Sequence, residues 1–218
     1  KDISDYILSA MKVNILDEKN GKDIERLMTF IDIEIENAED KEIYQIYRKT
    51  LLEIIYKLFN KLSTQYKVER GDYNDFVDKI NDDDTVITFN WDLLLDRIIK
   101  QKEQYKKTES LILDEMDLMT FNRTFDSKYL SERGYYLKLH GSIDWNYCTN
   151  SNCGANNKVL ITENDRCGRC FKHLSRLIIP PIINKQYKNY PFIEKIWTLA
   201  SIQLESAEEI VIWGYRLP

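Results

Sequence analysis

Apolar residues recur at helical spacing through the first third of the chain. Between residues 21 and 62, isoleucines, leucines and tyrosines fall three or four positions apart, and lysines and glutamates occupy the positions between them. This pattern predicts amphipathic helices. The segment 24–35 includes a short alternation, FIDIEIE, that also suits a strand, and we interpret it as helix. We expect the apolar face of these helices to pack in a core or to form an oligomer face.

The pattern changes near residue 83, where short apolar runs alternate with helical periodicity. Three runs predict sheet strands, namely TVITF at 85–89, YYLKLHG at 135–141 and EIVIWGY at 209–215. Leucines and isoleucines at helical spacing follow the first run, and a helix over 192–206 precedes the third. This alternation of strands and helices predicts an α/β fold with a parallel, Rossmann-like sheet.

Polar residues and glycine lie at the ends of these predicted strands. In parallel α/β sheets, ligands bind beyond the carboxyl ends of the strands. Asn90, His140 and Gly214 occupy such ends, so we expect them to converge on one site. Asn90, His140 and the nearby Asp92 also have simpler interpretations. Asn90 could cap the following helix, Asp92 could suit the dipole of its first turn, and His140 could be a buried histidine bonded to backbone.

All four cysteines of the chain form one cluster in the sequence. Cys148 and Cys153 are a Cys-x4-Cys pair, and Cys167 and Cys170 are a Cys-x2-Cys pair. Two close pairs of this kind can supply four thiolates to a closed tetrahedral site, which predicts a structural zinc ion. The alternatives are two disulfides or four unrelated core thiols. His173 could also replace one cysteine as a ligand.

Composition and charge narrow the class of protein. Apolar residues make up 43% of the 218 residues and charged residues 31%, as in ordinary globular domains. The net charge is −5, and acids alternate with bases rather than leaving a basic stripe, which argues against a nucleic-acid partner. No apolar run reaches the ~20 residues of a membrane span, and the first residues do not resemble a signal peptide. We expect a cytoplasmic location, where thiols stay reduced.

The order of these motifs resembles that of sirtuins. The segments TFNWDLLLD, LKLHGSIDW and IWGYRLP, with four cysteines after the second, resemble most closely the sirtuin-like NAD-hydrolysing domains of bacterial antiphage defence proteins. The resemblance covers about residues 83–218. It implies a Rossmann-like nucleotide-binding core at 83–147 and 174–218 and a zinc module at 148–173. The apolar periodicity predicts that residues 1–82 are a mainly helical part of the same domain.

The resemblance implies chemistry on NAD as a substrate, at the bond between ribose and nicotinamide. His140 would be the base near a ribose hydroxyl, a role that suits histidine because its ordinary pKa is close to neutral pH. Asn90 would orient the ribose or the attacking water, and Asp92 would contact the nicotinamide amide. Gly141 and Gly214 would lie against the dinucleotide. Zinc, held by the four cysteines, would be structural.

Two features depart from the family pattern. Sirtuin-like folds begin with a strand and a glycine-rich loop that binds the pyrophosphate, whereas no two of the seven glycines here are closer than seven positions. We therefore expect a fragment of a longer protein. Deacylases of the family carry a Phe-Gly-Glu segment that embraces the acyl-lysine peptide, and residues 185–187 read Lys-Gln-Tyr at that place if Pro180 is matched. In addition, Tyr215 and Arg216 replace the usual Thr and Ser.

The leading hypothesis is an NAD glycohydrolase that depletes NAD as the effector of an antiphage defence protein. It would act as a homo-oligomer or together with additional domains. One alternative is an NAD-dependent protein lysine deacylase. The other is a non-catalytic module that binds a nucleotide or a partner.

Overall fold

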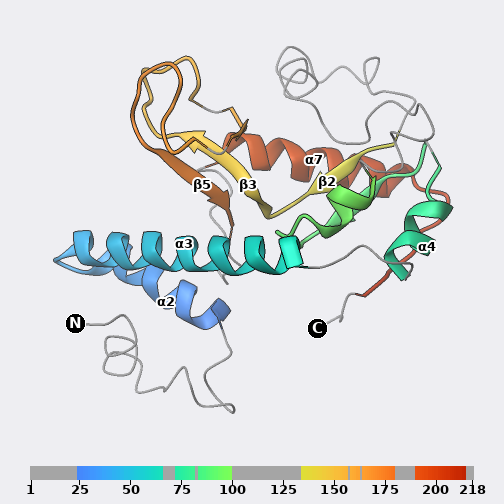
Figure 1. The fold of residues 1–218 in the computed structure, drawn as a ribbon, viewed down its shortest axis with the longest axis horizontal. Coiled ribbons are helices and arrows are strands. Elements are labelled where there is room, and N and C mark those ends of the chain that lie inside the picture. Colours follow the sequence, from blue (N-terminus) through green and yellow to red (C-terminus); the bar gives the residue numbers. More distant parts are fainter. Residues whose placement is uncertain are drawn as a thin grey trace.

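The computed structural model describes residues 24–65, 72–81, 83–99, 134–156, 158–162, 164–179 and 190–214. Its elements, in chain order, are α2 (Ile24–Asn37), α3 (Lys41–Gln65), α4 (Asp72–Lys79), β1 (Val86–Thr88), β2 (Tyr136–Lys138), β3 (Gly141–Cys148), β4 (Leu160–Ile161), β5 (Leu174–Ile178) and α7 (Pro191–Ser206) (Figure 1). Residues 94–99 are also helical. None of the helices searched in these ranges is both long enough and apolar enough to cross a membrane.

The strands form two small sheets. β1 and β2 pair in parallel, with Thr88 opposite Lys138 at the last paired position. β4, β3 and β5 form a three-stranded sheet in which β3 is antiparallel to both neighbours. The mixed α/β class and the parallel pairing of the first two predicted strands are thus confirmed. The antiparallel sheet was not predicted, and in the described ranges the parallel sheet has only two strands.

The strand predicted at 209–215 is wrong over its described part, because residues 209–214 form no strand. Their side chains are exposed, and Val211 is 74% exposed. The segment leaves α7 and passes α4, where the Trp213 ring stacks on Phe76 at 4.7 Å between centroids and meets Tyr73 edge-on at 4.9 Å (Figure 1). β-Branched residues form a strand only beside a neighbour that pairs with their backbone. Gly214 therefore does not lie at the end of a sheet strand.

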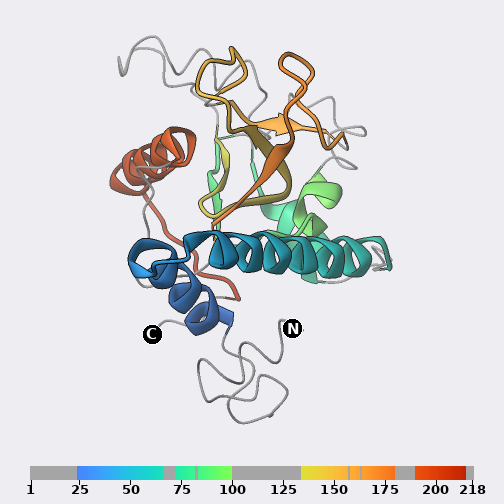
Figure 2. The same cartoon turned by 90° about the vertical axis from the view of Figure 1, so that its left-hand side faces the viewer.

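The helices α2 and α3 are confirmed, and they pack against each other through one apolar face. Met28, Ile31 and Ile55 are buried there together with Trp91 and with side chains of β3 and β5. An ion pair between Arg48 and Asp32, 2.8 Å long, joins the two helices outside the core. Figure 2 shows the pair lying beneath the strands. This face is a core face, which is one of the two uses predicted for it.

A second core lies between α7 and the strands. The Leu137, Trp145 and Ile193 side chains are buried in it, on β2, β3 and α7 respectively. α7 spans Pro191–Ser206, as the apolar periodicity predicted, and has proline in its first turn, where no backbone N–H is needed. Because α7 covers β2, it also covers the turn that follows β2.

Gly141 is required at the start of β3. Its φ is +76°, and a Cβ atom added there would lie 2.0 Å from the carbonyl oxygen of Leu177. We expect Gly141→Ala to lower the free energy of unfolding by about 2 kcal/mol or more, because it combines a left-handed backbone with a steric clash. Gly168→Ala is the control, because nothing lies within 4 Å of its added Cβ. Chemical denaturation of both variants tests this, and equal stability would contradict it.

Candidate functional site

The carboxyl ends of β1 and β2 bring two predicted site residues to one edge. Thr88 and Lys138 are the last residues paired, and Asn90 and His140 each follow two positions later. Beyond the last pair, the Leu139 amide still donates to the Thr88 carbonyl oxygen at 3.0 Å. Neighbouring strands lie about 4.8 Å apart. Two of the three strand ends expected to converge are therefore adjacent.

His140 occupies the turn between β2 and β3 and is only 5% exposed. Its ring lies 5.3 Å from the Phe89 ring and 6.2 Å from the Trp197 ring, centroid to centroid. Its carbonyl oxygen accepts a hydrogen bond from the Ile179 amide at 2.9 Å. The Trp197 indole also donates to the Leu139 carbonyl oxygen at 3.0 Å. The aromatic rings and the backbone bonds hold the histidine in a buried position.

Asn90 and Asp92 lie in the loop that follows β1. Asn90 is exposed, and its backbone amide donates to the Thr88 hydroxyl at 3.1 Å. Asp92 Oδ1 accepts from the Leu94 amide at 2.9 Å, at the start of the 94–99 helix. The side-chain oxygen that accepts an amide at the start of this helix thus belongs to Asp92, whereas the sequence allowed such an interaction for Asn90. Asp92 has a structural task whether or not it also contacts a ligand.

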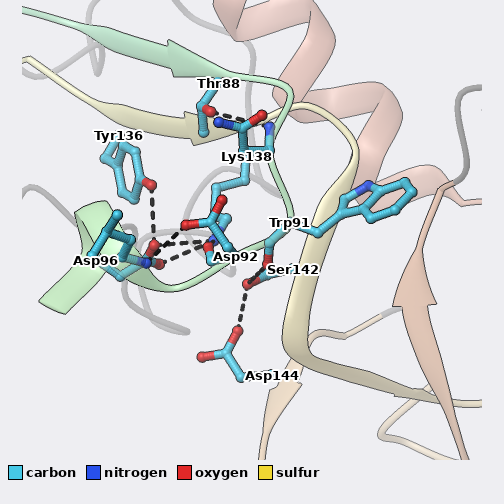
Figure 3. Close-up of polar contacts among 10 residues, drawn as sticks. Thr88, Trp91, Asp92, Asp96, Tyr136, Lys138, Ser142 and Asp144 are labelled. Atoms are coloured by element: carbon cyan, nitrogen blue, oxygen red, sulfur yellow. Dashed lines mark hydrogen bonds and ion pairs between the residues drawn. The ribbon is translucent and has the colours of Figure 1, made fainter. Parts of the chain in front are cut away.

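A buried polar network, which the sequence did not reveal, lies beside these residues (Figure 3). The Lys138 side chain is 2% exposed, and its Nζ lies 2.6 Å from the Asp92 carbonyl oxygen and 3.1 and 3.2 Å from the two Asp96 carboxylate oxygens. The Tyr136 hydroxyl donates to Asp96 at 3.1 Å. Burial raises the pKa of Asp96, and Lys138 opposes that rise. Burial and the nearby Asp96 also raise the pKa of Tyr136.

The loop that carries Asn90 is also tied to β3. The Ile143 amide donates to the Trp91 carbonyl oxygen at 3.0 Å, and the Trp91 indole donates to the Ile179 carbonyl oxygen at 3.2 Å. The Ser142 hydroxyl donates to Asp144 at 2.6 Å in the same region (Figure 3). The loop after β1 is therefore held by β2, by β3 and by the residue after β5.

The four cysteines form a second site at the far end of β3. Their sulfur atoms all lie within 4.8 Å of one another, and they are positioned to hold a metal ion. Cys148 Sγ lies 3.5 Å from Cys170 Sγ, and Cys153 Sγ lies 3.8 Å from Cys167 Sγ, without disulfides. The predicted grouping of four thiols is confirmed. His173 lies outside the cluster, is 59% exposed and pairs with Asp165 at 3.3 Å.

Backbone amides donate hydrogen bonds to three of these sulfurs. The Ala155 and Arg169 amides donate to Cys153 Sγ at 3.4 Å and to Cys167 Sγ at 3.5 Å, each from two residues further along the chain. The backbone amide of Lys172 likewise forms a hydrogen bond with Cys170, which lowers the pKa of that thiol to about 6. Burial has the opposite effect on Cys148 and raises its pKa to about 12. Such amide donors stabilise thiolates, which are the form that binds metals.

Comparison with known proteins does not assign the chain to a family. No protein-family model matches the chain, and no curated protein matches it. The predicted deacylase departure at Pro180 and residues 185–187 lies outside the described residues, as do Tyr215 and Arg216.

Proposed function

We propose that the chain is the NAD-hydrolysing domain of an antiphage defence effector. The observation that supports this best is the position of Asn90 and His140, each two residues beyond the last pair of two parallel strands. This is the edge at which α/β folds bind ligands. The two residues are also those that the sirtuin-like motifs assign to NAD.

The proposed reaction breaks the bond between the ribose C1′ and the nicotinamide nitrogen. The electron pair of that bond leaves with neutral nicotinamide, water adds its oxygen to C1′, and one proton is released. His140 would be the base near a ribose hydroxyl, in a surrounding of aromatic rings that would exclude bulk water. Asn90, whose side chain is exposed, would orient the ribose or the water. Asp92 would contact the nicotinamide amide, and Gly141 would lie against the dinucleotide. Gly214 is left out of this proposal, because it does not end a sheet strand and its neighbour Trp213 packs against Phe76 of α4.

We propose zinc as the metal of the cysteine site. Tetrahedral zinc with sulfur ligands at about 2.3 Å places neighbouring sulfurs about 3.8 Å apart. The separations of 3.5 and 3.8 Å are near that value. Four cysteine ligands leave no open coordination position, so the ion would brace the module without entering the reaction. Zinc would thereby fix the outer ends of β3 and β5.

The sirtuin-like resemblance also supports a cellular location and a mode of action for the domain. We place the domain in the cytoplasm, where NAD is available and thiols stay reduced. It would act as a homo-oligomer or with additional domains of the defence protein, which would hold its activity back until infection.

Product analysis tests the reaction. Full-length protein would be incubated with NAD, with and without an acetyl-lysine peptide, and the products separated by chromatography. We expect nicotinamide and ADP-ribose in equal amounts, whether or not the peptide is present. O-acetyl-ADP-ribose formed only with peptide would identify a deacylase instead. Tight NAD binding without products would identify a nucleotide-binding module.

A further inference from the structure

The buried ammonium of Lys138 joins the two chain segments that carry the proposed site. Lys138 lies on β2, two residues before His140. Its Nζ lies 2.6 Å from the carbonyl oxygen of Asp92, which lies two residues after Asn90 (Figure 3). We propose that Lys138 is a positioning residue that fixes the Asn90 loop against the His140 turn. This inference rests on the proposed function of that edge.

The contacts of Lys138 use the full capacity of its side chain. An ammonium group has three donors, and three acceptor oxygens lie within reach at 2.6, 3.1 and 3.2 Å. Two belong to the Asp96 carboxylate, and the third is the backbone oxygen of Asp92. A charge pair fixes its partners in one geometry, whereas an apolar pair in its place would tolerate small shifts of the loop.

Stability alone does not account for a charge at this place. A buried ion pair can often be replaced by apolar residues of similar volume without loss of stability, because burying the two charges costs about as much as their attraction returns. Lys138 is 2% exposed, and burial still raises the pKa of its partner Asp96. The contact with the Asp92 carbonyl oxygen is what distinguishes Lys138 from an ordinary core side chain.

Tyr136 provides a matched control in the same network. It lies on the same strand, and its hydroxyl donates to the same carboxylate, Asp96 Oδ2, at 3.1 Å. That bond reaches residue 96 in the helical segment, beyond the loop that carries Asn90. Tyr136→Phe therefore disturbs Asp96 and leaves the bond to Asp92 in place. Lys138→Met removes the ammonium group and its bond to Asp92 and keeps an unbranched side chain that is one atom shorter.

The kinetic test uses full-length protein and measures nicotinamide release from NAD. We expect Lys138→Met to lower kcat about 100-fold, because a small misplacement of reacting groups has effects of this size, and to change KM less than about threefold. Tyr136→Phe is expected to keep kcat within about twofold. The double variant Lys138→Met/Asp96→Leu, which leaves no unpaired buried charge, should regain thermal stability without regaining kcat.

A second measurement separates this inference from the proposed function. The Leu94 and Ile143 amides, which bond to Asp92 Oδ1 and to the Trp91 carbonyl oxygen, report on the loop by hydrogen exchange. We expect both to exchange at least about tenfold faster in the stable double variant than in Tyr136→Phe. If the wild-type protein releases no nicotinamide, the proposed function fails, and this exchange result still decides whether Lys138 fixes the loop. Wild-type kcat in Lys138→Met, or unchanged exchange in the double variant, would overturn the inference.

Discussion

Replacing Cys167 with serine is expected to release the metal and unfold the cysteine module. Cys167 is 1% exposed, and its sulfur lies in the cluster of four within 4.8 Å. Structural zinc contributes an apparent 10–16 kcal/mol in small zinc domains, roughly as much as the whole stability of a typical domain. Loss of one ligand therefore affects β3 and β5, which flank the module. We expect about one zinc ion per chain in the wild-type protein and a much lower thermal unfolding temperature for the variant.

His173→Ala is the control for this experiment. His173 lies in the same module, but it is 59% exposed and pairs with Asp165 rather than with the cysteines. This variant should keep its zinc and its unfolding temperature. Metal content by elemental analysis, together with thermal denaturation, decides the outcome. Disulfide-bonded wild-type protein without metal, or full zinc content in Cys167→Ser, would exclude the proposed zinc site.

Replacing either Asn90 or His140 with alanine is expected to lower NAD hydrolysis at least about 100-fold. A general base contributes about 10²–10⁴-fold in rate, and a residue that orients the reactants has effects of similar size. Asn90 is exposed, so its loss should scarcely change stability. His140 is buried at 5% exposure among aromatic rings, so its variant must be assayed well below its unfolding temperature.

The chain offers matched controls for both substitutions. Asn164 is exposed, and its backbone amide donates to the Thr162 hydroxyl at 3.1 Å. The backbone amide of Asn90 makes the same bond to the Thr88 hydroxyl. Asn164→Ala should therefore hydrolyse NAD at the wild-type rate, and so should His173→Ala, which removes the only other histidine. Steady-state release of nicotinamide compares the four variants. Equal rates in all of them would remove Asn90 and His140 from the reaction.

The helices and the cysteine cluster were predictable because their signals are local. The apolar period between residues 21 and 62 predicted helices where α2 and α3 lie, and the period in 192–206 matches α7 within one residue. The Cys-x4-Cys and Cys-x2-Cys pairs likewise predicted the cluster of four sulfur atoms that the structure contains. In each case the residues that cause the structure lie close together in the sequence.

The strand at 209–215 was mispredicted because its outcome depends on a distant partner. The run EIVIWGY has strong β propensity, yet Trp213 packs on α4, more than a hundred residues earlier in the chain. The Lys138 network was missed for a related reason. A lysine on a strand suggests exposure, and only tertiary structure shows that Asp96, 42 positions earlier, accepts its charge in the core. β3 was also missed, because the segment that begins it, GSIDW, has polar residues between its apolar ones and was interpreted as a site motif.

The most direct test of the proposed NAD hydrolysis is the release of nicotinamide and ADP-ribose by full-length wild-type protein, measured beside Asn90→Ala. Because Asn90 is exposed, a loss of activity in this variant cannot be attributed to unfolding. We expect equal amounts of both products from the wild type and at least about 100-fold less from the variant. Intact NAD after incubation with the wild type, or equal release by both proteins, would contradict it.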